Sequence, residues 1–275
     1  SKPSPRFGHT DIYDGNSNRM MVFGGATGFP APCMNDYYVM KQANAQGGTP
    51  TWVSVIPTGT APGVRTLQVS AYDGNTNTLM IFGGYNCNSA YYGDVWILQN
   101  ANDVSATPNW IQLQPTGTAP TARESASAIY DPNTNSLIVY GGDAGGEPLG
   151  DIWILSNANG TGGTPAWTQL NPSNSGPTPR SGHTATYDSV NNAMTIFGGY
   201  DGTNVLGETW VLAGANGQGG SAIWTQLTTG QLRRFHTSNY DPISNTMITF
   251  GGTTGVEVQA PSADLYTLGD ANNVQ

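Results

Sequence analysis

One unit repeated five times constrains this fold more than any other feature of the sequence. A Gly-Gly pair recurs along the chain, and an arginine stands eighteen residues before the first glycine of each pair. The pairs are Gly24-Gly25, Gly83-Gly84, Gly141-Gly142, Gly198-Gly199 and Gly251-Gly252, and the arginines are Arg6, Arg65, Arg123, Arg180 and Arg233. The repeats run approximately over 6–59, 65–117, 123–176, 180–229 and 233–275, and we expect them to form a single domain over 1–275.

Each repeat is interpreted as four short strands, a to d. Strand a runs from the arginine to a Tyr-Asp pair, and a turn rich in Asp, Asn and Pro follows it. Strand b is mostly apolar and ends at the Gly-Gly pair, strand c alternates aromatic residues, and strand d carries one Trp. Four-stranded antiparallel units repeated every 53 to 59 residues are typical of β-propeller blades. The sequence therefore predicts an all-β, five-bladed propeller.

The fifth repeat differs from the others because it ends "DLYTLGDANNVQ" without a Trp strand. The N-terminal "SKPSP" cannot supply that strand, since its prolines lack the donors of a sheet ladder. We expect the last blade to lack its fourth strand within this chain. Its open edge leaves three alternatives: the parent chain continues, the blade stays three-stranded, or a neighbouring subunit donates the strand.

A hydrophobic strand ending in Gly-Gly, an aromatic strand and then a further Trp resemble the kelch repeat, and the likeness covers essentially the whole chain. The resemblance implies a propeller whose a strands line a central channel, with arginines near the start of strand a contributing to a ligand face. Five repeats are fewer than the six or seven common in the family. Copper oxidases on kelch propellers need a tyrosine and histidine ligand set that this chain does not match, so we do not transfer that activity.

Composition narrows the possible partners. The net charge of −9 and the presence of only two lysines argue against nonspecific binding of nucleic acid or of an acidic membrane. No apolar run approaches the roughly 20 residues of a membrane span. Abundant Thr, Asn, Ser and Gly suggest an extracellular or cell-surface protein, in which Cys33 and Cys87 form a disulfide or stay two inert thiols.

The repeated arginines have two interpretations. Each can pair with the acid that opens strand c of its own or a neighbouring repeat; these acids are Asp36, Asp94, Asp151, Glu208 and Asp264. Alternatively, the arginines point into the channel mouth and bind an anion bidentately. We favour the ion pairs, because a position common to all repeats is first an architectural position.

The histidines His9, His183 and His236 stand three residues after the arginine in repeats 1, 4 and 5, whereas repeats 2 and 3 have Gln68 and Ala126 there. Three imidazoles can hold a metal, but equivalent positions around a ring lie far apart. We expect a histidine wedged between blades and bonded to backbone, and no metal or other cofactor. If the ring has a functional side, this asymmetry points to repeats 4, 5 and 1.

The b–c loops differ most among the repeats and carry aromatic residues beside polar ones. Tyr85, Tyr91, Tyr92 and Tyr200, with Asp201, suit sugar or peptide recognition, and ordinary loop polarity is the alternative. The c–d loops are near-copies and unlikely to form one specific site. One of them contains the glycosylation sequon Asn159-Gly-Thr.

These observations favour an extracellular binding module. Its Arg-rich face and b–c loops, with the three histidines, would bind a glycan or a protein partner. One alternative is a structural subunit of a surface assembly or filament that self-associates through the open edge of the last blade. Another is an epimerase or lyase acting on acidic sugars, although no catalytic residue is marked, since neither a nucleophile elbow nor a Ser-His-Asp cluster occurs.

Overall fold

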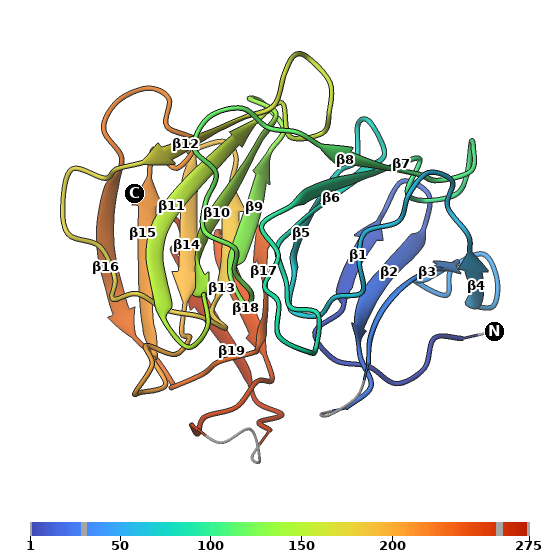
Figure 1. Cartoon of the computed structure of the whole chain (residues 1–275). Helices are drawn as coiled ribbons and strands as arrows, with labels where there is room; N and C mark the ends of the chain where they lie inside the picture. The colour runs from blue at the N-terminus through green and yellow to red at the C-terminus, as the bar shows by residue number, and fades with distance from the viewer. Residues whose placement is uncertain (1, 29–31, 257–260, 274–275) are drawn as a thin grey trace. The chain divides into compact units, whose positions relative to one another are not determined.

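The computed structural model describes residues 2–28, 32–256 and 261–273, and over these residues the protein is all-β (Figure 1). Nineteen strands form five antiparallel sheets, four of four strands and one of three. Each sheet corresponds to one repeat, and in each the strands pair in chain order. The predicted fold class is confirmed, including the last blade with only three strands.

Contacts divide the chain into two compact units. Unit 1 comprises the residues up to Glu124 together with Asn157–Pro165, and unit 2 comprises Ser125–Ser156 and the residues from Ala166 onward. Whether they form the predicted single domain stays a prediction.

The first two sheets belong to unit 1. The first contains β1 (Thr10–Asp14), β2 (Arg19–Ala26), β3 (Cys33–Lys41) and β4 (Thr51–Val55). The second contains β5 (Val69–Asp73), β6 (Thr78–Phe82), β7 (Val95–Gln99) and β8 (Asn109–Leu113).

The other three sheets belong to unit 2. The third contains β9 (Ser127–Asp131), β10 (Ser136–Asp143), β11 (Pro148–Ser156) and β12 (Ala166–Leu170). The fourth contains β13 (Thr184–Asp188), β14 (Ala193–Phe197), β15 (Glu208–Ala213) and β16 (Ile223–Thr229). The fifth contains β17 (Thr237–Asp241), β18 (Thr246–Phe250) and β19 (Leu265–Gly269).

The Tyr-Asp pair that ends every a strand shapes the turn into strand b. Asp14 shows the pattern: its Oδ1 accepts the Asn16 N–H at 3.0 Å, and its Oδ2 accepts the Ser17 hydroxyl at 2.5 Å. Asn18 closes the turn at φ 53°, a conformation that asparagine tolerates. The same contacts recur after the other four strands, so the turn-forming interpretation of this aspartate is confirmed.

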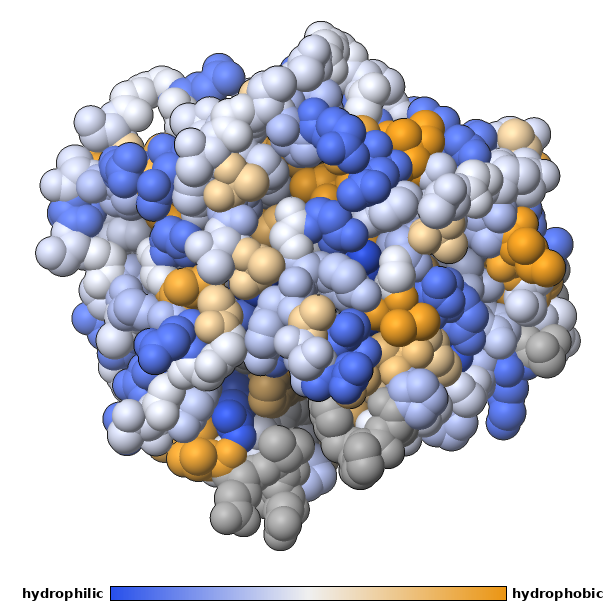
Figure 2. Space-filling view, in the orientation of Figure 1, coloured by the Kyte–Doolittle hydropathy of each residue, from blue (hydrophilic) through white to orange (hydrophobic). Residues whose placement is uncertain are grey.

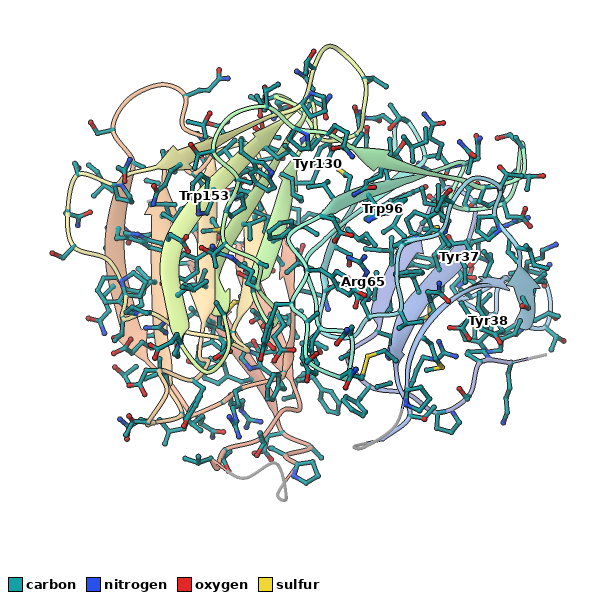
Figure 3. The ribbon with its side chains drawn as sticks, in the orientation of Figure 1. Tyr37, Tyr38, Arg65, Trp96, Tyr130 and Trp153 are labelled. Carbon is teal, nitrogen blue, oxygen red and sulfur yellow. A yellow bond between two sulfur atoms is a disulfide. The ribbon has the colours of Figure 1, made fainter. Side chains whose placement is uncertain are left out.

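Strand b is buried on both sides in the first four repeats, as its apolar sequence predicts. In unit 1, Phe23 and Tyr37 of the first repeat pack in one core with Leu79, Ile81 and Trp96 of the second (Figure 3). The core of unit 2 is built in the same way from the third and fourth repeats; its largest members are Tyr140, Ile138, Met194, Ile196 and Trp224. Neighbouring repeats thus share a core, which is how repeat proteins gain stability.

The near-identical c–d loops join consecutive repeats. After strand c of the second to fifth repeats, an Ala-Asn pair buries its alanine, and the asparagine amide donates to the turn aspartate of the repeat before it. The bonds run from Asn102 to Asp14, from Asn159 to Asp73 and from Asn216 to Asp131 at 2.8 Å, and from Asn272 to Asp188 at 2.5 Å. We call this contact the Asn–Asp lock. It also buries the sequon residue Asn159, whose amide is occupied by the bond.

Polar and weakly polar residues cover most of the face in Figure 2, with hydrophobic residues in small separate groups. Among the residues that the structure describes, no helix has the length and apolar character needed to cross a membrane.

Candidate functional site

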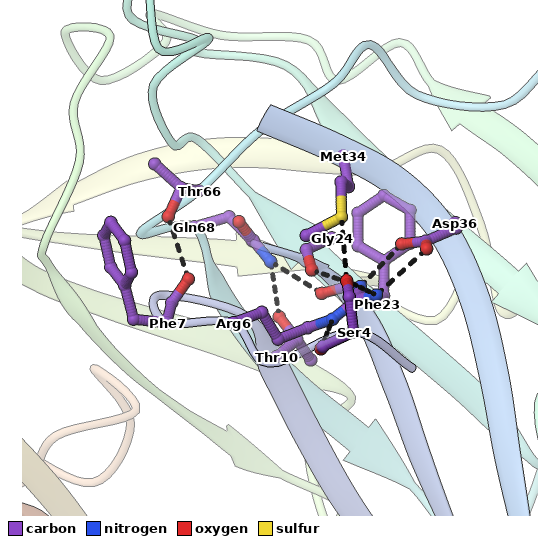
Figure 4. A network of polar contacts seen from close by, with 10 residues as sticks. All are labelled: Ser4, Arg6, Phe7, Thr10, Phe23, Gly24, Met34, Asp36, Thr66 and Gln68. Atoms are coloured by element: carbon purple, nitrogen blue, oxygen red, sulfur yellow. Dashed lines mark hydrogen bonds and ion pairs between the residues drawn. The ribbon is translucent and has the colours of Figure 1, made fainter. Parts of the chain in front are cut away.

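The repeated arginines lie inside the sheets. The side chain of Arg6 shows their arrangement (Figure 4). Its Nη1 donates to the carbonyl of Gly24 at 2.9 Å, and its two terminal nitrogens hold the Asp36 carboxylate at 2.6 and 3.0 Å. Its Nε donates to the carbonyl of Ser4, so one guanidinium ties strand a to the Gly-Gly pair and to strand c.

Three further arginines repeat this arrangement. Arg65, Arg180 and Arg233 are at most 1% exposed, and each donates to the carbonyl of the first glycine of its pair at 2.7 to 2.9 Å. Their carboxylate partners are Asp94, Glu208 and Asp264. Arg123 is equally buried and donates to the Thr121 carbonyl, while the acid at the matching sequence position, Asp151, belongs to unit 2.

These contacts give the arginines a structural role that accounts for their recurrence. Burial of a guanidinium is unfavourable unless its N–H groups have acceptors. Here the acceptors are carbonyls and a carboxylate within one repeat. The ion pair holds the pKa of Asp94 and of Glu208 below the usual range, against the opposing effect of burial. Ligand binding by the five arginines stays a prediction.

The histidines join consecutive repeats through their side chains. The Nε2 of His183 lies 2.8 Å from the Ser127 hydroxyl of the preceding a strand, and the Nε2 of His236 lies 2.8 Å from the Thr184 hydroxyl. Each ring also packs edge-on against the aromatic residue that ends strand b, Tyr140 or Phe197. For His183 and His236 the Nε2 partner is therefore a hydroxyl of the preceding repeat.

Burial keeps these imidazoles neutral. It lowers the pKa of His183 well below the usual value, with a further contribution from the Arg180 charge. It also lowers the pKa of His236 to about 4, and that of His9 in the same direction. The Nδ1 atoms of all three are buried without a hydrogen-bond partner among the described residues, so protonation would bury an unpaired N–H.

Gln68 occupies the histidine position in the second repeat and likewise bonds a hydroxyl of the preceding repeat. Its Nε2 donates to the Thr10 hydroxyl at 2.9 Å and to the Phe23 carbonyl at 3.3 Å (Figure 4). The change from histidine to glutamine thus conserves the contact between repeats. That the histidine pattern marks a functional side at repeats 4, 5 and 1 stays a prediction.

No group of three or more His, Cys, Asp or Glu side chains within 2–28, 32–256 and 261–273 is placed to hold a metal ion. The two cysteines, Cys33 and Cys87, form a disulfide that links the b–c loops of the first two repeats. Of the two alternatives left open by the sequence, the structure contains the bonded one.

The predicted loop aromatics of unit 1 group near this disulfide. The rings of Tyr85 and Tyr91 lie 5.1 Å apart, and their backbones form an isolated bridge. The Tyr92 ring instead covers the guanidinium of Arg65, at 4.1 Å from its centroid. Tyr85 and Tyr91 therefore form a partly exposed aromatic pair, while Tyr92 helps to cover the arginine.

A second aromatic group lies in unit 2 and contains two residues that our sequence analysis missed. The guanidinium of Arg234 lies 4.8 Å from the Tyr200 ring centroid and 5.4 Å from that of Phe235. Arg234 is 8% exposed, whereas Phe235 is 44% exposed. We call Tyr200, Arg234 and Phe235 the aromatic–arginine cluster. The neighbouring Asp201 caps its own loop by accepting the N–H groups of Thr203 and Asn204.

The backbone at Phe235 is strained. The residue two places after the repeated arginine has a positive φ in every repeat; the other four are Gly8 at 60°, Leu67 at 55°, Ser125 at 53° and Gly182 at 63°. Phe235 adopts 55° at this position, although a bulky side chain rarely accepts that conformation. A signal for it stands in the sequence, since "RRFHTS" replaces the glycine of "PRFGHT" and "PRSGHT" with phenylalanine. Strain of this kind clusters at binding sites.

Comparison with known proteins identifies the repeat. The sequence matches the family model described as KLHDC2/KLHL20/DRC7 Kelch-repeats domain over residues 1–161 and 100–231.

Three relatives show how far the similarity extends. The chain is 28% identical to host cell factor of Drosophila melanogaster over 66% of its own length and 12% of that protein. It is 26% identical to an F-box/kelch-repeat protein of Arabidopsis thaliana over 91% of this chain and 55% of that protein. It is 29% identical to dynein regulatory complex subunit 7 of Chlamydomonas reinhardtii over 50% of this chain and 11% of that protein. The chain thus spans about half of the length of these relatives or much less.

Proposed function

Because the chain belongs to the kelch-repeat family, we propose that it is a module that binds a protein partner through the aromatic–arginine cluster. The observation that carries the proposal is the Phe235 ring, which is 44% exposed beside the Arg234 guanidinium and stands on a backbone held at positive φ. Phe235 offers apolar area, and the stacked Arg234 offers a cation beside it. Aromatic residues and arginine dominate the binding energy of protein interfaces.

The repeated arginines and the histidines make contacts that stabilise the fold, which leaves them less available to a partner. The five repeated arginines are buried and paired with backbone or acids, and the histidines bind hydroxyls between strands. Arg234 lies directly after one of those arginines, yet it stacks on loop rings instead. In the "RRFHTS" motif, Arg233 is the arginine that every repeat has, whereas Arg234 is an additional one.

We also place the protein outside the cell or at its surface. The disulfide Cys33–Cys87 supports this proposal, because disulfides persist in oxidising compartments and are rare in the cytosol. The scarcity of lysine agrees with it. A cytosolic expression experiment in which both cysteines stay reduced, with no loss of stability, would count against this location.

Selection from a random-peptide display library tests the protein-binding proposal. Peptides enriched on the wild-type protein should bind the Phe235→Gly variant at least about tenfold more weakly, since interface hot spots are typically aromatic. Glycine suits the positive φ, so this variant should keep its fold and melting temperature. Ile56→Ser, at a residue 88% exposed in unit 1, is the matched control and should bind normally.

A glycan array run beside the library separates the two ligand classes that the sequence suggested. Glycan binding stays a prediction, and Tyr85 with Tyr91 is the aromatic pair that would stack on a sugar. Glycan binding that survives Phe235→Gly, together with no peptide enrichment, would replace the protein-binding proposal. Equal peptide binding by wild type and Phe235→Gly would refute the assignment of the cluster.

A further inference from the structure

The connection between the third and fourth repeats departs from the two connections before it. All three have the same length, because each places the repeated arginine thirteen residues after the Trp of strand d. The first two contain "PTGTAP" (57–62 and 115–120), whereas the third contains "PSNSGP" (172–177). Besides two changes of Thr to Ser, the third connection therefore has Asn174 at a glycine position and Gly176 at an alanine position.

Asn174 makes through its side chain a contact that the first connection makes through its backbone. In the first connection, the carbonyl of Thr58 accepts the N–H of Trp110 at 2.9 Å. In the third, the Oδ1 of Asn174 accepts the N–H of Trp224 at 2.9 Å, and its Nδ2 donates to the Trp224 carbonyl at 2.8 Å. A side chain thus replaces a backbone carbonyl in this contact, so the two backbones take different paths after it.

Gly176 leaves space at the indole edge of Trp224. A β-carbon at position 176 would lie 2.4 Å from the Cδ1 and 2.5 Å from the Nε1 of that ring, so a side chain there would collide with it. Gly176 is not at positive φ, so space rather than backbone conformation requires the glycine. Trp224 is only 5% exposed, and its Nε1–H has no acceptor among the residues that the structure describes.

A cavity of about 180 Å³ opens beside these two residues, and its lining lies wholly in unit 2. Trp224 and the buried Ile152 belong to the lining, as does Leu170 at the end of β12. The exposed residues Gln169 and Asn171 also line it, and neither amide has a hydrogen-bond partner in the described part of the chain. The cavity therefore combines apolar surface with amides that are free to bind.

The lining favours a neutral ligand that is rich in hydroxyl groups. Each amide offers donors and an acceptor, and the indole adds a donor, which suits hydroxyls because they both donate and accept. Asp151 is the acid of the lining, and its Oδ2 accepts the Trp153 Nε1–H at 2.6 Å. No Lys, Arg or His is among the described residues that line the cavity, so an anion would find no cation there. Ile152 and Leu170 suit the C–H groups of a ring.

We propose that this cavity binds one neutral sugar residue, as a free monosaccharide or as the terminal residue of a glycan. Its volume of about 180 Å³ is below the roughly 300 Å³ at which pockets take drug-sized ligands, which favours a single ring over a longer chain. Because Gln169 and Asn171 are exposed, the rest of a glycan can stay in solvent. The site shares no residue with the aromatic–arginine cluster, and it lies in a different unit from Tyr85 and Tyr91.

Saturation-transfer NMR with methyl glycosides of neutral hexoses and N-acetylhexosamines tests the proposal, with the methyl glycoside of glucuronic acid beside them. At least one neutral glycoside should bind the wild-type protein with a dissociation constant on the order of 1 mM. Gln169→Ala with Asn171→Ala should weaken that binding about tenfold or more, because two hydrogen-bonding side chains are lost. Gln112→Ala is the matched control, since Gln112 has the position of Gln169 in the second repeat, where "PTGTAP" follows. It should bind as wild type does.

Gly176→Ala examines the space itself. It places against the Trp224 ring the alanine that the first two connections have, and binding should be lost. If this variant also melts at a lower temperature, the pair of changes at the exposed Gln169 and Asn171 still tests the site without disturbing the core.

An array of glycans that end in the selected sugar distinguishes the two sources of the ligand. Binding to the array identifies a glycan terminus, and binding of the free glycoside alone identifies a monosaccharide. Phe235→Gly should bind the glycoside as wild type does, so this proposal and the protein-binding proposal fail separately. The sugar site is overturned if no neutral glycoside binds below about 50 mM. It is also overturned if the double amide variant binds as tightly as wild type, or if the glucuronide binds as tightly as the neutral sugars.

Discussion

At the scale of single residues, the arginine of each repeat is an internal anchor. Its position three residues before a histidine resembles an active-site motif, but the two side chains serve different partners. The Arg180 guanidinium binds within its own repeat, to the carbonyls of Thr178 and Gly198 and to Glu208. His183 binds Ser127 of the repeat before it. One short motif therefore holds a blade together and attaches it to its neighbour.

Removal of this anchor should be severely destabilising. Arg180→Ala leaves the buried Gly198 carbonyl and the Glu208 carboxylate without their donor, so the free energy of unfolding should fall by about 3 kcal/mol or more. Urea denaturation at neutral pH measures it, with Lys41→Ala, an exposed cation, as the control. A loss below about 0.5 kcal/mol, within the range of ordinary surface substitutions, would contradict the structural role and revive ligand binding.

The buried histidines should make stability depend on pH in a defined window. In the unfolded chain His236 has a pKa near 6.5, whereas burial lowers its pKa to about 4 in the folded protein. The unfolded state therefore holds more protons between these values, and the free energy of unfolding falls as the pH is lowered through them. His236 alone should contribute roughly 2 kcal/mol of loss between pH 7 and pH 5.

His236→Gln provides the matched comparison, because Gln68 makes the equivalent contact in the second repeat. This variant should retain most of its stability at pH 7 and lose visibly less than wild type between pH 7 and pH 5. Thermal unfolding at a series of pH values measures both. Identical pH profiles for the two proteins would show that His236 does not control the loss. The carboxylates whose pKa is lowered, such as Asp94, contribute only at lower pH.

Sequence patterns could predict the position of these residues but not their partners. The arginine spacing and the acid opening strand c were visible, and so was the ion-pair alternative that the geometry contains. Arg234 and Phe235 were overlooked because the repeat directs attention to what recurs, and these two are departures from it. The second arginine of "RRFHTS" and the phenylalanine after it were the available signal, and its meaning depends on a backbone angle that only the structure supplies.

At the scale of the element, the c–d loops contact the preceding repeat, and this contact restricts their sequence. Their low complexity follows from one contact that the second to fifth repeats share, namely burial of an alanine and donation from an asparagine to the preceding turn. The two partners of a lock lie 84 to 88 residues apart in the sequence. Strands, turns and the missing fourth strand were predictable from local pattern, whereas such a pairing needs the packing of whole sheets.

The first repeat offers an internal control for the energy of this contact. Asn102→Ala removes the amide that binds the buried Asp14, so the free energy of unfolding should fall by about 1–3 kcal/mol. Asn44→Ala removes the same side chain at the equivalent position, where its amide nitrogen has no partner among the described residues, and it should change the free energy by less than about 0.5 kcal/mol. Urea denaturation compares the two. Equal losses would show that the asparagine stabilises its own loop and not the lock.

At the scale of the whole molecule, the acidic composition sets the terms of any association. The chain carries a net charge of −9 at neutral pH, and only two of its 275 residues are lysine. A basic peptide is therefore attracted over a distance comparable to the Debye length, and an acidic one is repelled.

Salt should consequently weaken the capture of basic peptides. Raising the NaCl concentration from about 0.05 M to about 0.5 M shortens the Debye length from roughly 14 Å to roughly 4 Å and screens the attraction, while apolar burial persists. We expect the dissociation constant of a basic peptide selected on the wild-type protein to rise severalfold, and to rise in the same way for the Val190→Gln variant, which leaves the charge unchanged. A dissociation constant that stays the same over this range would mean that apolar contact alone holds the peptide, and the net charge would then have no part in its capture.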